Sequence, residues 1–173
     1  GMGKNKLQAE LGVSKLQADE LFKQYHTKVP FVKQLMDAVM SRAQRKGKVR
    51  TLLGRLCRFH LWEPNQFGIH KPLPHDDALS EHGPGIRRAY TYKALNRLIQ
   101  GSAADQAKQA MIDCYKAGHL PLLQIHDELC FSIGNDEDIK IIKNKMENAV
   151  ENLKVPFKCD VALGKSWGEA KDE

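Results

Sequence analysis

The stretch from Leu120 to Ile133 constrains the fold of this chain more than any other. Two apolar runs in it flank a short charged centre, His126-Asp127-Glu128. Apolar runs separated by turn-forming polar residues predict a β-hairpin with a buried face. A carboxylate inside such a segment is costly unless a cation faces it. The centre is therefore either a site for a metal ion or a basic side chain, or simply an acidic turn, since Asp is common in turns.

The order of the residues favours the first interpretation. Residues 124–129, Gln-Ile-His-Asp-Glu-Leu, resemble the palm hairpin of family A DNA polymerases, the group that includes bacterial polymerase I and many phage replicases. Residues 94–105 resemble the family's palm helix, with an Asn, a Gln and a Gly-Ser-Ala-Ala-Asp run. A third similarity covers residues 155–157 and 164–170. Three matches in the family's order are far more specific than any one of them.

The resemblance implies an α+β fold, with helices around a small antiparallel palm-type sheet that contains a central catalytic hairpin. The sheet is expected to combine this hairpin with a strand over residues 155–163. Three segments are expected along the chain. These are a helical fingers-like segment (1–47), a basic hairpin with a Pro-rich loop (48–85) and a palm-like segment (86–173).

Local patterns predict the helices of the first segment. Helical spacing of leucines predicts a helix over residues 4–11. Ser14, followed three residues later by Gln17, has the spacing of a capping box that starts the next helix. Pro30 is placed in the first turn of a third helix, which Gly47 ends.

Further helices are predicted later in the chain. Residues 62–85 read as a loop that holds one short helix over 76–82. A helical pattern then runs from residue 86 to residue 116. Asp136 is expected to cap a last helix, whose apolar positions continue to Leu153.

Basic residues crowd between residues 42 and 58, and no acidic residue interrupts them. Two short β-like runs, 49–53 and 56–60, predict a hairpin within this stretch. Such a cluster is either a solvated face or a surface that contacts phosphates, and the formal net charge of +6 gives weak support to a polyanionic partner. The candidate DNA-contacting arginines are Arg50, Arg55 and Arg58.

Two amides in the palm-helix segment are candidate readers of DNA. Asn96 and Gln100 are four residues apart, so on a helix they share one face. They suit the minor groove, where every base pair offers acceptors, although a pair of surface amides would have the same spacing. Lys93 is a further candidate for DNA contact. The neighbouring Tyr92 stands where bacterial members of the family carry an Arg, so the DNA contact of that Arg is not carried over to this position.

The resemblance also implies a chemistry, two-metal nucleotidyl transfer by a DNA-directed DNA polymerase with Mg²⁺ as cofactor. Asp127 corresponds to one of the two metal-bridging aspartates, Glu128 to the carboxylate beside it, and His126 to a residue at the primer terminus. Two divalent ions roughly 4 Å apart need carboxylates from more than one place. The family's second aspartate and its nucleotide-binding helix have no counterpart in this sequence.

The chain is therefore expected not to extend a primer alone. Its expected partners are primer–template DNA, deoxynucleoside triphosphates and an upstream polymerase chain that supplies the missing palm, thumb and nucleotide-binding helix. Such a division would arise from a split gene, for example a viral one, or from an engineered piece. The alternative is a non-catalytic nucleic-acid-binding or assembly module that retains the palm surface. Gly1 before Met2 fits either a scar of tag removal or the end of the family's Tyr-Gly-x-Gly segment.

Composition bears on the compartment. The four cysteines are scattered, with no Cys-x-x-Cys pair, so reduced thiols fit better than a disulfide framework or a zinc site. No apolar run approaches the roughly 18 residues that span a bilayer, and no signal-peptide pattern opens the chain. The expected location is the cytoplasm, or the host cytoplasm for a viral protein, with no membrane partner.

Overall fold

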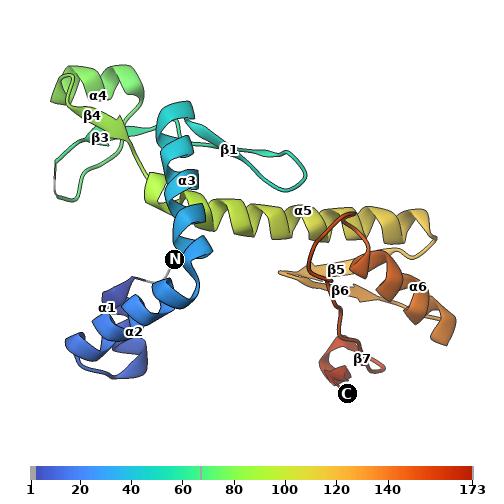
Figure 1. Cartoon of the computed structure of the whole chain (residues 1–173). Coiled ribbons are helices and arrows are strands. Elements are labelled where there is room, and N and C mark those ends of the chain that lie inside the picture. Colours follow the sequence, from blue (N-terminus) through green and yellow to red (C-terminus); the bar gives the residue numbers. More distant parts are fainter. Residues whose placement is uncertain (1–2, 67, 173) are drawn as a thin grey trace. The chain divides into compact units, whose positions relative to one another are not determined.

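The computed structural model describes residues 3–66 and 68–172 and has an α+β fold, which confirms the expected class (Figure 1). It divides into two compact units, the first ending at Gln100 and the second beginning at Gly101. The longest helix, α5 (Ala94–Lys116), contributes residues to both. The expectation for the first two residues lies outside the described part. Within that part, no helix is long and apolar enough to cross a membrane.

The first unit opens with three helices, α1 (Lys4–Leu11), α2 (Lys15–Lys28) and α3 (Pro30–Lys46). All three were predicted. The hydroxyl of Ser14 accepts a hydrogen bond from the backbone N–H of Gln17, and the Gln17 side chain accepts one from the Ser14 backbone, so the capping box is present. Pro30 begins α3, and Gly47 ends it with φ 65° in the left-handed region.

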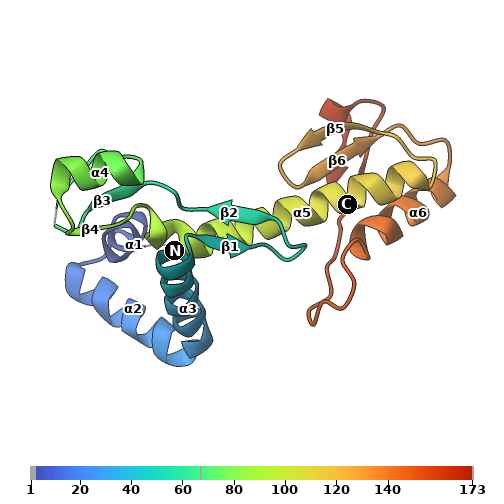
Figure 2. The same cartoon turned by 90° about the horizontal axis from the view of Figure 1, so that it is seen from above.

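The basic stretch forms the predicted hairpin, an antiparallel ladder of β1 (Lys48–Arg50) and β2 (Leu56–Arg58), seen side by side in Figure 2. Val49 pairs with Cys57, and Val49 is 2% exposed in the core of this unit. Because side chains alternate along a strand, the basic residues at either side of Val49 lie on the opposite face. The core comprises Val39, Ala43, Val49, Phe59 and Ala94, with Met40, Cys57 and Leu98 packed against it.

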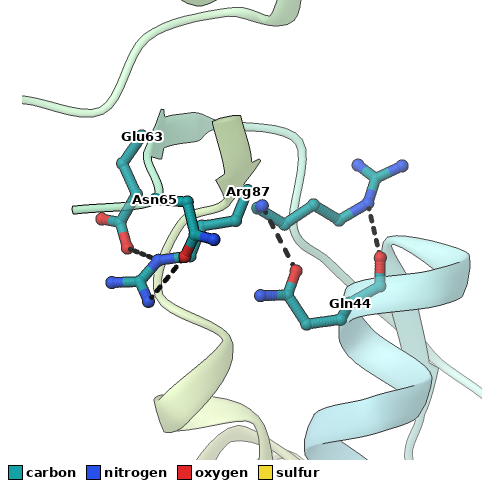
Figure 3. Close-up of polar contacts among 5 residues, drawn as sticks. Gln44, Glu63, Asn65 and Arg87 are labelled. Carbon is teal, nitrogen blue, oxygen red and sulfur yellow. Dashed lines mark hydrogen bonds and ion pairs between the residues drawn. The ribbon is translucent and has the colours of Figure 1, made fainter. Parts of the chain in front are cut away.

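The expected helix from Ile86 is wrong at its start. Ile86 to Arg88 form strand β4, which pairs with β3 (Trp62–Pro64); α4 (His75–His82) lies between them in the sequence, and a 3-10 turn, η1 (Thr91–Lys93), precedes α5. Arg87 lies opposite Glu63 in this ladder, and the Arg87 guanidinium donates to the Glu63 carboxylate at 3.0 Å and to Asn65 at 3.5 Å (Figure 3). Cross-strand pairing and this ion pair stabilise residues 86–88 as a strand, although the helical pattern of the sequence includes them. The helix itself begins only at residue 94.

Arg88 ties the elements of the first unit together. Its Nε donates to the backbone carbonyl of Gln44 at 3.1 Å, and its Nη1 donates to the carbonyl of Phe59 at 2.9 Å. The Gln44 side chain in turn accepts a hydrogen bond from the Arg88 backbone N–H at 3.2 Å (Figure 3). The guanidinium also lies 4.4 Å from the ring centroid of Trp62. Since the last carbonyls of a helix lack partners within it, Arg88 caps the end of α3.

Gly47 leaves the space that Arg88 occupies. A Cβ atom at position 47 would lie 2.7 Å from the Arg88 Cζ atom, and the backbone there has φ 65°. We expect Gly47→Ala to lower the free energy of unfolding by about 1–2 kcal/mol from the left-handed conformation alone, and by more because Arg88 must move. Urea denaturation measures the change.

Gly12→Ala is the matched control, because Gly12 also ends a helix with φ 62° but has open space around its missing Cβ. If both variants lose the same stability, the Arg88 contact contributes nothing and only backbone strain is seen.

The second unit contains the hairpin of β5 (Pro121–Ile125) and β6 (Glu128–Phe131), α6 (Asp136–Glu147), and a short ladder of β7 (Ala162–Leu163) with β8 (Lys171–Asp172); η2 (Trp167–Glu169) precedes β8. The cap of α6 is Asn135, and not Asp136 as predicted, because the Asn135 side chain accepts from the N–H groups of Glu137 and Asp138. The helix ends at Glu147, so the predicted helix was too long, and its last apolar positions, as far as Leu153, lie outside α6. Buried residues of this unit include Ala110, Cys114, Ile142, Ala149 and Val150.

Two expectations about the sheet are wrong. Of the strand predicted over 155–163, only Ala162 and Leu163 are in a strand, and they pair with β8 rather than with the hairpin. The hairpin has no buried face either, since Leu122 is 62% and Leu123 is 45% exposed. The physical reason is that the ladder of β5 and β6 has two strands, and no third strand pairs with it among the described residues.

Glu147 contacts the segment in which the strand was predicted. Its carboxylate accepts the backbone N–H of Cys159 at 3.2 Å and lies 3.3 Å from the Lys158 amine. The N–H of Cys159 is therefore committed to a side chain and not to a strand partner. The hydrogen bond from Cys159, and then the Lys158 amine, hold the pKa of Glu147 below its ordinary value of 4.5.

A carboxyl whose pKa is lowered by folding stabilises the fold above its ordinary pKa and loses this contribution as pH falls through the lowered value. We therefore expect the amide proton of Cys159 to be protected from exchange at neutral pH and to lose protection in acid, below the ordinary pKa of 4.5. Hydrogen exchange followed by NMR measures this. Glu147→Gln keeps an acceptor but cannot titrate, so in this variant the protection of the Cys159 amide should not depend on pH in this range once the intrinsic exchange rate is corrected for. If the variant keeps the acid transition of the wild-type chain, Glu147 is not the group that protects this amide.

Candidate functional site

The predicted acidic turn joins β5 to β6 through two residues. Ile125 pairs with Glu128 at the end of the ladder, so only His126 and Asp127 lie between the strands. His126 has φ 54°, in the left-handed region. This conformation costs a non-glycine residue on the order of 1 kcal/mol, although His adopts it more readily than most. The Gln124 amide donates to the His126 carbonyl at 3.2 Å and supports the turn. The backbone strain therefore lies directly before Asp127.

The carboxylates of Asp127 and Glu128 are both exposed. Neither makes a hydrogen bond or ion pair through its side chain within residues 3–66 and 68–172. Carboxylate oxygens are the ligands that Mg²⁺ prefers, and this ion often takes one or two carboxylates together with water and phosphate oxygens. No group of three or more His, Cys, Asp or Glu that could hold a metal is found in the described part of the chain. The turn thus fits a part of a Mg²⁺ site, and the other ligands would come from elsewhere.

The two predicted amides lie at the beginning of α5. Asn96 and Gln100 are exposed and share one face of the helix, as their spacing predicts. The Lys93 amine lies just before them, 5.1 Å from the ring centroid of Tyr90 and 5.6 Å from that of Tyr92. A cation held near aromatic rings loses less freedom on binding an anion. This end of the helix therefore presents hydrogen-bonding amides next to a positioned positive charge.

The outer face of the ladder of β1 and β2 is basic. Lys48 lies directly opposite Arg58, and like charges in this position destabilise a ladder. Arg50 donates to the Gly54 carbonyl at 2.8 Å, which fixes its side chain along the turn, and Arg55 is exposed in the loop between the strands. A polyanion bound on this face would relieve the repulsion that the ladder carries.

One residue that the sequence prediction missed connects the basic ladder to α5. Arg97 donates to the backbone carbonyl of Arg58 at 3.2 Å, and its guanidinium lies 4.9 Å from the ring centroid of Phe59. The only sequence signal was a positive charge beside Asn96, since the hydrogen bond joins residues 39 positions apart. All the predicted DNA-contacting residues, Asn96, Gln100, Arg50, Arg55, Arg58 and Lys93, belong to the first unit, whereas His126, Asp127 and Glu128 belong to the second.

Comparisons with known proteins agree with these features. A family model described as DNA polymerase family A matches residues 1–169. The chain is 38% identical to a DNA-directed DNA polymerase of Pseudomonas phage M6 over 83% of its length, and 31% identical over its whole length to the thermostable DNA polymerase I of Thermus filiformis. It spans only 18% and 19% of these two relatives. The solved POL domain of Pol1 from M. smegmatis, in complex with DNA primer-template and dNTP, matches 98% of the chain and 28% of its own chain, with a TM-score of 0.73 and 30% identity.

The strain at His126 can be tested by local stability. His126→Val places a β-branched residue at φ 54° and should destabilise the hairpin by about 1–2 kcal/mol, which speeds amide exchange at Ile125 and Glu128 by roughly 5–30-fold. His126→Asn is the matched control, because Asn tolerates the left-handed region. Equal exchange rates in the two variants would show that the turn does not hold this conformation.

Proposed function

The chain belongs to DNA polymerase family A, and on that premise we propose that it contributes part of the catalytic site and of the primer–template surface to template-directed DNA synthesis. One observation carries the proposal: a chain that matches the family over nearly its whole length has two exposed, unpaired carboxylates at the hairpin turn that resembles the family's palm hairpin. The M. smegmatis neighbour, which binds DNA primer-template and dNTP, supports the same substrates here.

In this proposal the turn residues act at the primer end. Asp127 is a metal ligand, Glu128 arranges the ligands beside it, and His126 lies against the primer terminus. Bound Mg²⁺ would lower the pKa of the primer 3′-hydroxyl and stabilise the leaving pyrophosphate. The exposure of both carboxylates supports these roles, since a carboxylate already paired with a lysine or arginine would have to be freed first.

The first unit binds and positions DNA. Asn96 and Gln100 donate hydrogen bonds to minor-groove acceptors, which every base pair offers, so that pair geometry is checked without reading sequence. The basic residues Arg50, Arg55, Arg58 and Lys93 contact backbone phosphates, and this term gives affinity that depends on salt but not on sequence. The like-charged pair of Lys48 and Arg58 supports a polyanionic partner.

The proposal requires further polypeptide. One aspartate does not supply enough negative charge to offset the mutual repulsion of two Mg²⁺ ions, so the second aspartate and the nucleotide-binding helix come from an upstream polymerase chain. The exposed leucines Leu122 and Leu123 of the hairpin, and Leu120 directly before it, support a partner that covers them. The proposal includes three segments along the chain, which are fingers-like (1–47), basic (48–85) and palm-like (86–173). It also includes a cytoplasmic location, or the host cytoplasm for a viral protein, which the four free cysteines support.

A chimera in which this chain replaces the matched segment of the phage M6 polymerase tests the proposal. We expect the chimera to incorporate nucleotides in a Mg²⁺-dependent manner and the isolated chain to incorporate none. Asp127→Asn should abolish incorporation with DNA affinity nearly unchanged, because it removes a metal ligand and no phosphate-binding cation. Glu128→Gln should cost about 10–100-fold, as for groups that orient a metal ligand.

Asp160→Asn is the matched control, since Asp160 is an exposed carboxylate of the same unit and has no proposed role. Near-normal incorporation by Asp127→Asn would remove Asp127 from the metal site and return the turn to an ordinary acidic turn. A folded chimera that binds DNA but incorporates nothing would favour the non-catalytic binding module instead.

A further inference from the structure

A small cavity lies beside the basic ladder in the first unit. Residues 58–61, which leave β2, line one side of it, and Ala89, Tyr90 and Arg97 line the other. Its volume is about 80 Å³. The walls are fixed by the backbone, because the N–H of Ala89 donates to the Leu61 carbonyl at 2.9 Å and the N–H of Phe59 donates to the Gly47 carbonyl at 2.8 Å. The cavity is therefore a built feature of the fold.

Its floor is apolar and its rim is cationic. Phe59 is 3% and Ala89 1% exposed, whereas Arg58 and Arg97 are exposed at the mouth. Arg97 is held in place by its bond to the Arg58 carbonyl and by the Phe59 ring. A guanidinium has five N–H donors in a rigid fork, so most of those of Arg97 remain for a ligand. Pre-organisation of this kind lowers the entropy cost of binding an anion.

Two further observations indicate an anionic ligand. Tyr90, which lines the cavity, has φ 59°, and strain of this kind in a non-glycine residue clusters at binding sites. The Lys93 amine lies over the Tyr90 ring, and Lys48 lies opposite Arg58. Neither arginine forms an ion pair with a carboxylate among the described residues. Two arginines thus line the cavity and two lysines neighbour its lining residues, and in the described part of the chain no acid forms an ion pair with either arginine.

The size of the cavity decides between the two parts of a nucleotide that could enter it. A cavity needs roughly 10–15 Å³ to hold one water molecule, so about 80 Å³ holds about five to eight atoms of that size. A phosphate group, with one phosphorus and four oxygens, fits this space. A purine base has about twice as many non-hydrogen atoms and does not fit, and the charged rim also favours the phosphate.

We propose that Arg58 and Arg97 together hold one phosphate group of the DNA backbone in this cavity. The inference rests on the proposed function for its partner, and it adds a site and a residue, Arg97, to the DNA surface. Arg97 is the pre-organised half of the pair, and Arg58 is the half that closes on the phosphate. Two guanidiniums that hold one phosphate attract the DNA strand and also fix its position on the protein.

The test measures DNA affinity of the isolated chain against salt concentration, by fluorescence anisotropy with a short duplex. We expect Arg97→Gln and Arg58→Gln each to weaken binding about tenfold at about 50 mM salt, since charge-assisted bonds to phosphate are strong. Because both arginines hold the same phosphate, the double variant should lose less than the product of the single losses. Its salt slope should be shallower by about 0.9 in total, the value for one phosphate.

Three controls keep the test decisive. Lys154→Gln removes one exposed positive charge from the second unit and should change affinity little. Arg97→Lys keeps the charge but loses the fork, and should bind between the wild-type chain and Arg97→Gln. Urea denaturation checks folding, and Arg58→Gln is the safer variant, since the Arg58 side chain makes no hydrogen bond or ion pair among the described residues.

Independent losses that multiply, with a slope change of about 1.8, would mean two separate phosphates and would overturn the shared site. A loss in Arg97→Gln no greater than in Lys154→Gln would remove Arg97 from the DNA surface, and a wild-type chain that binds no duplex would also overturn the proposal. These binding results are independent of nucleotide incorporation by the chimera, so failure of the shared phosphate site and failure of the catalytic proposal are distinguishable.

Discussion

The Arg88 guanidinium is the interaction on which the first unit depends. It bonds the last turn of α3 through Gln44 and the end of β2 through Phe59, and it lies against Trp62 of β3. Without it, a helix C-terminus and a strand carbonyl would lack a partner inside a unit whose core is small. A buried carbonyl left unpaired costs about 1–3 kcal/mol, so one arginine secures several elements at once.

The same interaction shapes the DNA surface proposed for this unit. Phe59, whose carbonyl Arg88 holds, carries the ring against which Arg97 lies. The basic face of the ladder and the start of α5 are therefore connected through a fixed aromatic side chain rather than through flexible surface arginines. A rigid arrangement of cations suits phosphates at a defined spacing, since little freedom is lost when they bind.

The second unit presents the opposite situation. Its hairpin has a well-defined two-residue turn, yet its leucines are exposed and its carboxylates are unpaired. The exposed leucines are unfavourable for an isolated unit, whereas the exposed carboxylates are hydrated and cost little. Both properties are useful in a larger assembly, because apolar surface can be covered by further polypeptide and free carboxylates can bind cations. The chain spans only 18% of the length of the phage relative, which agrees with a place in a larger assembly.

Local chemistry let the sequence predict much of this protein. The capping box at Ser14, the helix end at Gly47, the basic hairpin and the turn at His126 and Asp127 all follow from residues within a few positions of one another. The resemblance to family A polymerases was also readable, because it rests on short ordered motifs.

Only the tertiary structure decided the rest. Ile86 to Arg88 pair as a strand because Glu63 and Trp62 lie opposite, and in the segment 155–161, where no strand forms, Glu147 takes the N–H of Cys159. Arg97 enters the proposed DNA surface only through its contacts with Phe59 and Arg58, which are distant in the sequence. In each case the deciding partner is far along the chain, and neither periodicity nor propensity carries information about a contact that folding alone creates.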